Sequence, residues 1–349
     1  MINVGIVGAT GYAGEELIDI CLRHPNVRIT YLSAKIDKPE EISEIFPKFK
    51  GRIKLICKEP NIKEIIANCD LVFLALPHTV SMEIVPQLLS DRKKVIDLSA
   101  DYRLRDTKIY AQFYKTKHKD KMHLPEGIYG LPEIYRAKIK NARLIANPGC
   151  YPTAAILALA PVVAFNLVDL DTIIIDAKSG VTGAGRKTTQ DFFFSEIDED
   201  FKAYKVNTHQ HAPEINQELS KLAGKKINVT FVPHLLPLNR GILATIYVKK
   251  SQSHPSTSLR TGKVTKSQSL IGLYKKFYKK EPFIRIKKEG YFPKLKDVVG
   301  TNYCDIGIKD SGNIVIIIAV IDNLLKGASG QAVQNMNIMY NFPEYKALL

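Results

Sequence analysis

Long apolar runs are missing from the 349-residue sequence. No stretch reaches the roughly 18 consecutive apolar residues that a membrane-spanning helix needs, and the longest candidates, such as residues 314–321, have the length of a strand. The first residues lack the charged segment and the cleavage site of a signal peptide, so we expect none. These absences argue against a membrane or secreted protein and favour a cytoplasmic one.

Cysteine is sparse, and its pattern excludes two further classes of protein. The five cysteines (21, 57, 69, 150 and 304) are odd in number, widely spaced and without a CxxC pair. This pattern argues against a disulfide framework and against a cysteine-rich zinc site, and it fits a reducing compartment. Internal repeats are also absent, and we expect no metal.

The length predicts about two domains. A hydrophobic content of 45% and a charged content of 24% are ordinary for a soluble globular protein. The net charge of +15 comes mostly from scattered lysines, densest over residues 275–288. We interpret these lysines as a solvated surface rather than a nucleic-acid site. Their positive field would attract anionic substrates and cofactors, or an acidic protein partner.

A strand, a glycine-rich turn and a helix open the chain. Residues 2–7 have the pattern of a buried strand, and residues 15–22 that of a helix. The intervening turn has glycines that let a pyrophosphate approach backbone N–H groups at the helix start. Its spacing, G-x-x-G-x-x-G, is not the commonest, and a turn without a ligand is the alternative. The candidate cofactor residues here are Gly8, Thr10, Gly11, Tyr12, Ala13 and Gly14.

The end of the second strand, residues 27–32, bears on the choice of cofactor. An NAD-binding unit usually places an acidic residue there for the ribose hydroxyls. Here Ser33 and Lys35 follow, with Lys38 close behind. A hydroxyl and a cation suit a 2′-phosphate, so we predict NADP(H). An ordinary exposed loop is the alternative.

Further apolar runs at 53–56, 71–76 and 95–98 alternate with helical patterns at 61–67 and 81–90, which predicts a doubly wound parallel sheet. Ligands bind beyond the carboxyl ends of such strands. There, Arg103 could hold a phosphate or carboxylate with two hydrogen bonds, or form a salt bridge with Asp101 or Asp106. The polar segment 104–123 is predicted to be a loop.

Cys150 lies in the segment 147–153, between a short apolar run and a long one. This pattern predicts a strand, a tight turn and a helix, with Pro152 in the first helical turn. A thiol at that position faces the positive end of the helix dipole, which favours the nucleophilic thiolate. The alternative is a buried cysteine that packs as a small hydrophobic residue.

The second half of the chain has a different pattern. Strands are predicted at 172–177, 227–232, 241–248, 283–287, 303–308 and 313–321, with a helix at 270–278. Few helices separate them, so we expect an α+β domain with a mixed or antiparallel sheet. A second glycine-rich loop, 178–186, is either an anion site or a plain loop. Residues 251–268 are low in apolar residues and are predicted to be an exposed insertion.

We place the domain boundaries at 1–148 for the cofactor domain, completed by a C-terminal helix within 327–349, and 149–326 for the second domain. His209 and His211 lie two residues apart in the second domain, where a helix starts near Pro213. They could form part of a zinc site, although no further ligands at suitable spacing are evident. They could also supply an acid and base beside Cys150, or simply be satisfied within the fold.

Eight segments carry a resemblance to a known family. In chain order they are GIVGATGYAGEEL, GIYGLPE, NPGCYPTA, DAKSGVTGAGR, HQHAPEI, FVPHLLPLNRGILATIY, VVGTNYCDI and DNLLKGASGQAVQNMN. The chain thereby resembles the N-acetyl-γ-glutamyl-phosphate reductases, the arginine-pathway branch of the semialdehyde dehydrogenase superfamily. The insertion at 251–268 departs from the family pattern, but it falls on a predicted loop.

The resemblance implies a Rossmann-type NADP domain interrupted by a catalytic and oligomerisation domain, in a homodimer or homotetramer. It implies NADPH-dependent reduction of an acyl phosphate through a thioester on Cys150, with His209 as acid and base and release of phosphate. The implied substrate contacts are Arg103, Asn147, Tyr204, His211 and Glu214. The implied cofactor contacts include both glycine loops, with Ser179, Gly180 and Asn323.

Two alternatives remain open. The first is a related reductase whose glutamyl or aminoadipyl phosphate is bound to a small acidic carrier protein, which the basic surface would suit; its 176–186 and 209–215 segments differ from those here. Aspartate-semialdehyde dehydrogenase is further away, because its histidine motif differs. The second is a non-catalytic NADP-binding or nucleic-acid-binding protein, which would leave Cys150 and His209 without a role.

Overall fold

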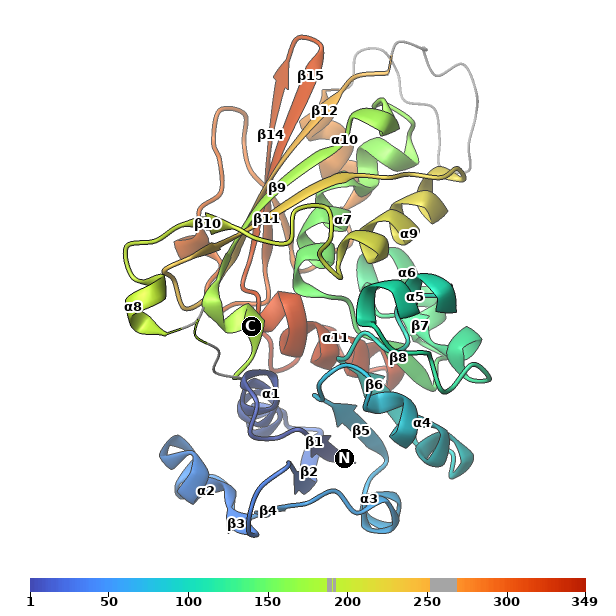
Figure 1. The fold of residues 1–349 in the computed structure, drawn as a ribbon, viewed down its shortest axis with the longest axis vertical. Helices are drawn as coiled ribbons and strands as arrows, with labels where there is room; N and C mark the ends of the chain where they lie inside the picture. Colours follow the sequence, from blue (N-terminus) through green and yellow to red (C-terminus); the bar gives the residue numbers. More distant parts are fainter. Residues whose placement is uncertain (187–189, 191–192, 252–268) are drawn as a thin grey trace. The chain divides into compact units, whose positions relative to one another are not determined.

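The structure is a computed structural model that describes residues 1–186, 190, 193–251 and 269–349 (Figure 1). Of the predicted insertion at 251–268, all but Ser251 lies outside the described residues. The chain divides into two compact units, which are described separately below. The first consists of Met1–Gly149 with Ala328–Leu349, and the second of Cys150–Gly327. In the described residues, no helix has both the length and the apolar character to cross a membrane.

The first unit contains an eight-stranded sheet in the order β3-β4-β2-β1-β5-β6-β8-β7. All neighbouring strands are parallel except β3 and β4. The predicted Rossmann-type sheet is therefore confirmed. Its strands are β1 (Ile2–Val7), β2 (Val27–Ser33), β3 (Glu40–Glu41), β4 (Ile56–Lys58), β5 (Leu71–Leu74), β6 (Lys94–Asp97), β7 (Ile128–Tyr129) and β8 (Leu144–Ala146).

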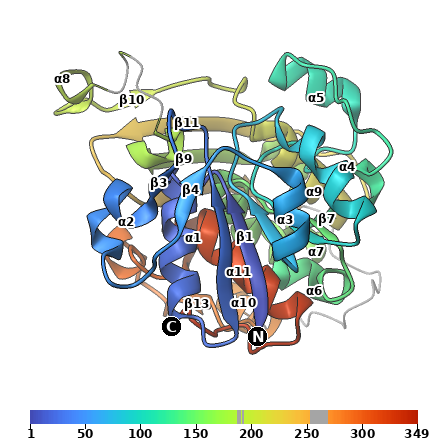
Figure 2. The same ribbon diagram turned by 90° about the horizontal axis from the view of Figure 1, so that it is seen from below.

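Helices lie on both faces of this sheet, as the alternation of strand and helix patterns requires. In Figure 2, α1 and α3 lie on opposite sides of β1; α11 packs on α1, and α4 on α3. The α-helices are α1 (Tyr12–Arg23), α2 (Ile42–Ile45), α3 (Ile62–Asn68), α4 (Ser81–Ser90), α5 (Thr107–Tyr114), α6 (Pro132–Ile139) and α11 (Gly330–Met339), with 3-10 turns at Pro47–Phe49 and Leu124–Glu126.

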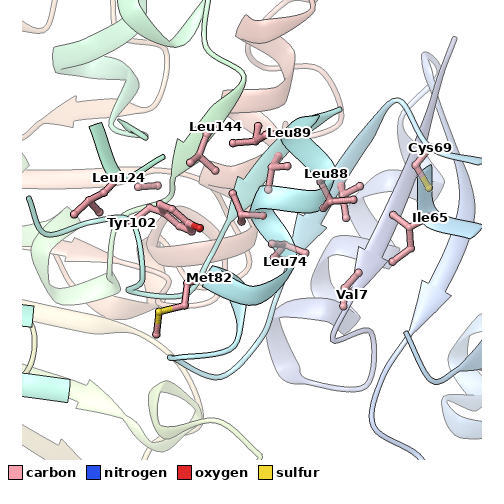
Figure 3. Packing of buried hydrophobic residues seen from close by; sticks show 14 of the residues in the cluster. Val7, Ile65, Cys69, Leu74, Met82, Leu88, Leu89, Tyr102, Leu124 and Leu144 are labelled. Carbon is pink, nitrogen blue, oxygen red and sulfur yellow. The ribbon is translucent and has the colours of Figure 1, made fainter. Parts of the chain in front are cut away.

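A hydrophobic cluster fills the space between the sheet and the α3–α4 side. The cluster includes Leu88 and Leu89 of α4 with Leu74 of β5, and Leu89 lies beside Leu144 of β8 (Figure 3). Tyr102 and Leu124 also belong to it. Fully burying one such side chain contributes about 1.5–3 kcal/mol. This packing supports β5 and β6, and the loop that carries Arg103 leaves the carboxyl end of β6.

The prediction of a loop over 104–123 is wrong in part, because α5 (Thr107–Tyr114) lies within it. The helix is short, and Asp106 begins it by accepting hydrogen bonds from the N–H groups of Lys108 and Ile109 at 2.7 and 3.3 Å. Tyr110 and Tyr114 stack with their ring centroids 4.8 Å apart. Tyrosines supply the apolar side of this helix, so a scan for aliphatic periodicity misses it.

The second unit contains a seven-stranded mixed sheet in the order β10-β11-β9-β12-β15-β14-β13. The pairs β9–β11 and β13–β14 are parallel, and the other neighbours are antiparallel. The predicted mixed sheet is confirmed. Its strands are β9 (Ile174–Gly180), β10 (Lys202–Ala203), β11 (Thr230–Leu236), β12 (Ile242–Lys249), β13 (Ile284–Ile286), β14 (Cys304–Ser311) and β15 (Ile314–Ile321).

Helix α7 (Cys150–Ala164) is the core helix of the second unit, and it packs on β12 and β15. It is apolar on all sides and almost wholly buried, as expected for a helix covered on every face. Helices α9 and α10 lie on the same side of the sheet (Figure 1). The remaining helices are α8 (Phe194–Ile197), α9 (Ala212–Ala223) and α10 (Leu270–Phe277), with 3-10 turns at Leu170–Thr172, Val181–Ala184 and Leu295–Asp297 and a π-helical turn at Leu325–Ser329.

Candidate active site

The first glycine loop joins β1 to α1 in the first unit. The N–H groups of Gly8 and Ala9 donate to the carbonyl of Ser33 at 2.7 and 2.9 Å, which ties the loop to the end of β2. Gly8 has φ +92°, and a Cβ on Gly14 would lie 2.2 Å from the carbonyl oxygen of Gly8. Gly11 precedes α1 and makes no side-chain cap. Close backbone approach and an uncapped helix start fit a pyrophosphate.

The other predicted cofactor residues of this unit lie around the loop. Thr10, Tyr12 and Ala13 are partly exposed, and Lys35 is exposed. Ser33 is fully buried, and among the described residues its hydroxyl has no hydrogen-bond partner. A buried hydroxyl in that condition at the end of β2 fits a cofactor whose ribose phosphate reaches that point.

Arg103 and Asn147 are brought together in the first unit. Buried Arg103 donates from Nε to the carbonyl of Asn147 and from Nη2 to that of Leu98, both at 2.7 Å. Asn147 is also buried; its amide donates to the carbonyl of Ala328 and accepts from Asn335, both at 3.1 Å. These contacts hold the chain three residues before Cys150.

A buried acid pair beside this loop was not predicted as part of the site. Asp101 accepts hydrogen bonds from Tyr110 at 2.7 Å and from the N–H of Thr79 at 2.8 Å, and Thr79 has φ +78°. Asp97 accepts from the hydroxyls of Ser81 and Ser99 at 2.7 and 2.8 Å. Burial, and then the charge of Asp101, raise the pKa of Asp97 to about 7. The pair connects residues far apart in sequence, so no local pattern predicts it.

Cys150 begins α7 in the second unit, at the helix start that the sequence predicts. It is the partly exposed cysteine, and the other four are buried. Burial raises the pKa of the Cys21 thiol to about 12 and that of Cys57 to about 11, and it also raises the pKa of Cys69. Cys150 is therefore the thiol that a reagent or substrate can reach.

A chain of hydrogen bonds runs through the aromatic residues around His209. The N–H of His211 donates to Nδ1 of His209 at 3.0 Å, so in the neutral ring Nε2 carries the proton. Nε2 lies 3.5 Å from the hydroxyl of Tyr204, which lies 3.3 Å from that of Tyr151. Tyr151 donates to the carbonyl of His234 at 3.1 Å. Because Tyr151 has a single proton, the chain runs from His209 through Tyr204 to Tyr151.

The pKa values of Tyr151 and Tyr204 both depend on the charge of Cys150. Burial raises the pKa of Tyr204 to about 12, and a charge on Cys150 acts in the same direction. Burial also raises the pKa of Tyr151, with smaller effects from Tyr204 and Cys150. Cys150 thus lies within electrostatic reach of the residue that hydrogen-bonds His209. Tyr151 belongs to this cluster although it was not predicted as a site residue; its position next to Cys150 was the available signal.

His211 and Glu214 lie at the start of α9. The rings of His209 and His211 have centroids 4.8 Å apart, and Glu214 is buried in the first helical turn. Within the described ranges, no group of three or more His, Cys, Asp or Glu side chains is arranged to hold a metal ion. The two histidines instead belong to the aromatic cluster of Tyr151 and Tyr204.

Ser179, Gly180 and Asn323 form a network at the second glycine loop. Ser179 is buried and donates to the carbonyl of Gly180 at 2.9 Å. The side chain of Asn323 accepts from the N–H of Gly241 at 2.7 Å and donates to the hydroxyl of Thr182 at 3.0 Å. This network fixes the loop that follows β9.

Two family models match the chain. Residues 3–142 match the model described as "Semialdehyde dehydrogenase, NAD binding domain", and residues 150–323 match "Semialdehyde dehydrogenase, dimerisation domain". Nicotinamide-cofactor binding by the first unit agrees with its glycine loop. The first match lies within the first compact unit, and the second match lies within the second compact unit.

Relatives with assigned names align over nearly the full length. The N-acetyl-gamma-glutamyl-phosphate reductase of Desulforamulus reducens is 47% identical, over 100% of this chain and 98% of that protein. The protein of the same name from Citrifermentans bemidjiense is 49% identical, over 99% and 97%.

Solved structures share the fold at low identity. Aspartate semialdehyde dehydrogenase II of Vibrio cholerae, complexed with ASA, has a TM-score of 0.70 at 17% identity and covers 98% of both chains. The Candida albicans aspartate semialdehyde dehydrogenase with NADP has a TM-score of 0.65 at 15% identity, over 97% of this chain and 98% of that one. At these identities the likeness establishes the fold.

Proposed function

The chain belongs to the N-acetyl-gamma-glutamyl-phosphate reductases of the semialdehyde dehydrogenase family, and from this premise we propose that it reduces N-acetyl-γ-glutamyl phosphate to N-acetylglutamate 5-semialdehyde in arginine biosynthesis. One observation carries the proposal. A partly exposed thiol, Cys150, begins α7 within electrostatic reach of the Tyr204–His209 hydrogen bond. A nucleophile next to a positioned imidazole is the arrangement that acyl transfer needs.

Cys150 is the proposed nucleophile. The start of α7 favours its thiolate, because the helix dipole and the N–H groups of the first turn are directed at it. The thiolate attacks the acyl carbon, the carbon–oxygen bond to phosphate breaks, and a thioester on Cys150 forms. After reduction, the resulting thiohemiacetal collapses to the aldehyde and restores the thiolate. The net reaction consumes one hydride and one proton, and the proton leaves on phosphate.

His209 is the proposed acid and base. It would act through Nε2, which in the tautomer favoured by the His211 N–H carries the proton and is a donor. To take up a proton at Nε2, the ring must carry its proton on Nδ1 instead, with the His211 contact broken. In the neutral ring, Nε2–H donates to the oxygen that becomes negative when Cys150 attacks. Tyr204 lies 3.5 Å from Nε2 and orients the ring. We assign Arg103, Asn147, His211 and Glu214 to the binding or positioning of the substrate, with Arg103 on its phosphate.

We propose NADP(H) as the cofactor, and it supplies the hydride when bound. Gly8, Gly11 and Gly14 would approach its pyrophosphate. Ser33 and Lys35 would hold the 2′-phosphate, since the buried Ser33 hydroxyl is without a partner in the described chain and a cation follows two residues later. The remaining proposed contacts are Thr10, Tyr12, Ala13, Ser179, Gly180 and Asn323.

We further propose a homo-oligomer that assembles through the second unit. The sheet face opposite α7 carries apolar side chains that are partly exposed, among them Ile174 at 43% and Tyr247 at 39%. Ile316 pairs with Tyr247 across β12–β15, which extends the apolar row. A contiguous exposed apolar row of this kind marks an interaction surface. A nucleophilic thiol and four other free cysteines favour a reducing, cytoplasmic location.

The test is the reverse reaction of the purified protein. N-acetylglutamate semialdehyde, phosphate and NADP⁺ are supplied, and NADPH is followed by its absorbance. Phosphate-dependent reduction is expected in the wild type and is expected to be lost in Cys150→Ser. Cys57→Ala is the matched control, since it removes a buried thiol from β4 and is expected to retain activity. NAD⁺ in place of NADP⁺ is expected to support a slower reaction.

Two outcomes contradict the proposal. Full activity of Cys150→Ser removes the thioester route. A wild type that binds NADPH but shows no reaction with the free semialdehyde removes the free small molecule as substrate, and a carrier-bound acyl phosphate then becomes the next candidate.

A further inference from the structure

Asp322 follows β15 directly, and its carboxylate is fully buried. Oδ1 accepts hydrogen bonds from the N–H groups of Leu324 and Leu325 at 2.8 and 3.1 Å. Oδ2 accepts from the N–H of Gly300 at 2.8 Å and lies 3.0 Å from Nε of Arg240. Nη2 of Arg240 also donates to Oδ1 at 3.1 Å. One carboxylate therefore joins three separate segments of the second unit.

The turn that Asp322 organises ends against the nucleophile. The N–H of Gly327 donates to the carbonyl of Asp322 at 2.9 Å, which closes the turn. A Cβ on Gly327 would lie 2.8 Å from Cβ of Cys150. At that distance no side chain fits, so the backbone of Gly327 packs directly on Cys150. The turn also enters the π-helical segment Leu325–Ser329, a geometry that frequently marks functional sites.

The second residue of the turn is anchored independently. Asn323 bonds to the N–H of Gly241 at 2.7 Å and to the hydroxyl of Thr182 at 3.0 Å. Thr182 in turn donates to the carbonyl of Asn239 at 2.6 Å. The start of the turn is thus anchored to the loops that follow β9 and β11, and its end packs on Cys150.

Replacing the carboxylate by an amide of the same size would disturb this arrangement. Among the described residues, the groups that hydrogen-bond the two oxygens of Asp322 are donors. An asparagine side chain presents one acceptor and one donor. One N–H group would then face another, and the guanidinium of Arg240 would lose its counter-charge. Removing one partner from a buried ion pair is strongly destabilising for the local structure.

We propose that Asp322 is a positioning residue: it holds the 322–327 turn against Cys150 and so sets the orientation and reactivity of the thiolate. The kinetic part of this inference rests on the proposed function, and the part that concerns thiol reactivity does not. Misplacement of a reacting atom by about 1 Å can cost on the order of 100-fold in rate, so a small shift of Gly327 is enough to be measured.

Asp322→Asn tests the inference, with Asp305→Asn as its matched control. Asp305 lies in β14, the strand next to β15, and is also fully buried. Its carboxylate is paired with Arg285 of β13 at 2.5 Å. The primary readout is the rate at which iodoacetamide alkylates Cys150 from pH 5 to 9, located by peptide mapping. Thermal midpoints and, where the wild type is active, kcat and KM are measured on the same samples.

Asp322→Asn is expected to slow Cys150 alkylation by about tenfold or more and to lower kcat more than it changes KM for NADPH. Asp305→Asn is expected to lower the thermal midpoint while Cys150 alkylation stays within about twofold of wild type. If Asp322→Asn does not fold, Arg240→Lys replaces it, and an intermediate slowing is expected because a lysine keeps the charge but loses the two-point contact.

An alkylation rate that is unchanged or faster in Asp322→Asn, or in Arg240→Lys where that variant stands in for it, overturns the proposal. Equal slowing in Asp305→Asn also overturns it, because the effect would then be general destabilisation. A wild type without reductase activity whose Cys150 alkylation is nevertheless slowed by Asp322→Asn contradicts the proposed function and leaves the positioning role supported.

Discussion

Asp97 illustrates how a single buried group makes the stability of the first unit depend on pH. Burial and the neighbouring Asp101 raise its pKa in the folded protein to about 7, whereas an unfolded aspartate titrates near 3.9. Between these values the folded state binds more protons than the unfolded state, so the free energy of unfolding falls as pH rises. Above about pH 7 no further loss from this group is expected.

Asp97→Asn is expected to remove this pH dependence. Relative to wild type, its free energy of unfolding is expected to rise by about 2 kcal/mol between pH 5 and pH 8. Urea unfolding at several pH values measures the difference, and circular dichroism checks the native fold at each pH. Asp101→Asn removes the neighbouring charge and is expected to shift the dependence to lower pH. If the free energies of unfolding of Asp97→Asn and wild type differed by the same amount at every pH, Asp97 would not be the source of the pH dependence.

At the residue scale, the sequence reveals groups that lie in one motif and misses those joined through space. Cys150, His209 and His211 are visible because turn, proline and helix patterns surround them. Asp322 and Arg240 each lie in a segment that carries the family resemblance. Their ion pair is not visible in the sequence, because it connects residues 82 apart along the chain. Ser33 was predicted from its position just after the expected strand 27–32, whereas the absence of a partner for its buried hydroxyl among the described residues is visible only in the folded structure.

At the scale of elements, the β1–α1 loop makes a sharp steric prediction. A Cβ at residue 14 would lie 2.2 Å from the carbonyl oxygen of Gly8, whereas one at residue 11 would lie 3.5 Å from it. Gly14→Ala is therefore expected to weaken NADPH binding by about tenfold or more and to cost about 1–3 kcal/mol of stability. Gly11→Ala has the room it needs and is expected to show a smaller loss of both.

Titration of NADPH, followed by the fluorescence of its reduced nicotinamide, measures both affinities, and thermal unfolding measures the stability change. Equal affinities for Gly14→Ala and wild type would show that the loop does not need close contact between β1 and α1. The same would follow if Gly11→Ala were the more damaging change.

Element types were predictable where the hydrophobic pattern is strong. The strands β1, β2 and β15 and the helix α4 lie where the sequence predicts them. Helix α5 was missed because Asp106 and two stacked tyrosines define it, rather than an aliphatic stripe. The short segments α8 and β10 lie at the acidic stretch before Tyr204. They have four and two residues, which is too short for a hydrophobic period to be recognised in the sequence.

At the scale of the whole molecule, the apolar row on the second sheet predicts a change of assembly on mutation. The double variant Ile174→Lys, Ile316→Lys would place two charges on the proposed interface, and burying unpaired charges is costly. The dissociation constant of the oligomer is expected to rise by about 100-fold or more. Sedimentation velocity over a range of concentrations measures it.

Ile56→Lys is the control for that experiment. Ile56 is 58% exposed and belongs to β4 in the sheet of the first unit, so this variant also replaces an exposed isoleucine by a charge, but outside the second sheet. It is expected to leave assembly unchanged. A double variant that assembles as wild type does would exclude this sheet face as the interface.

The first unit is built from both ends of the chain, and this has a consequence for how the protein is made. All ten residues of α11 are buried, and the helix packs on α1 and α6, which precede it by some two hundred residues or more. As the chain leaves the ribosome, the second unit is complete before α11 emerges. Until then the surfaces of α1 and α6 are uncovered, so a message cut short before codon 330 yields a chain that chaperones and proteases can recognise. Only a chain translated through α11 can bury the surfaces of α1 and α6 that this helix covers.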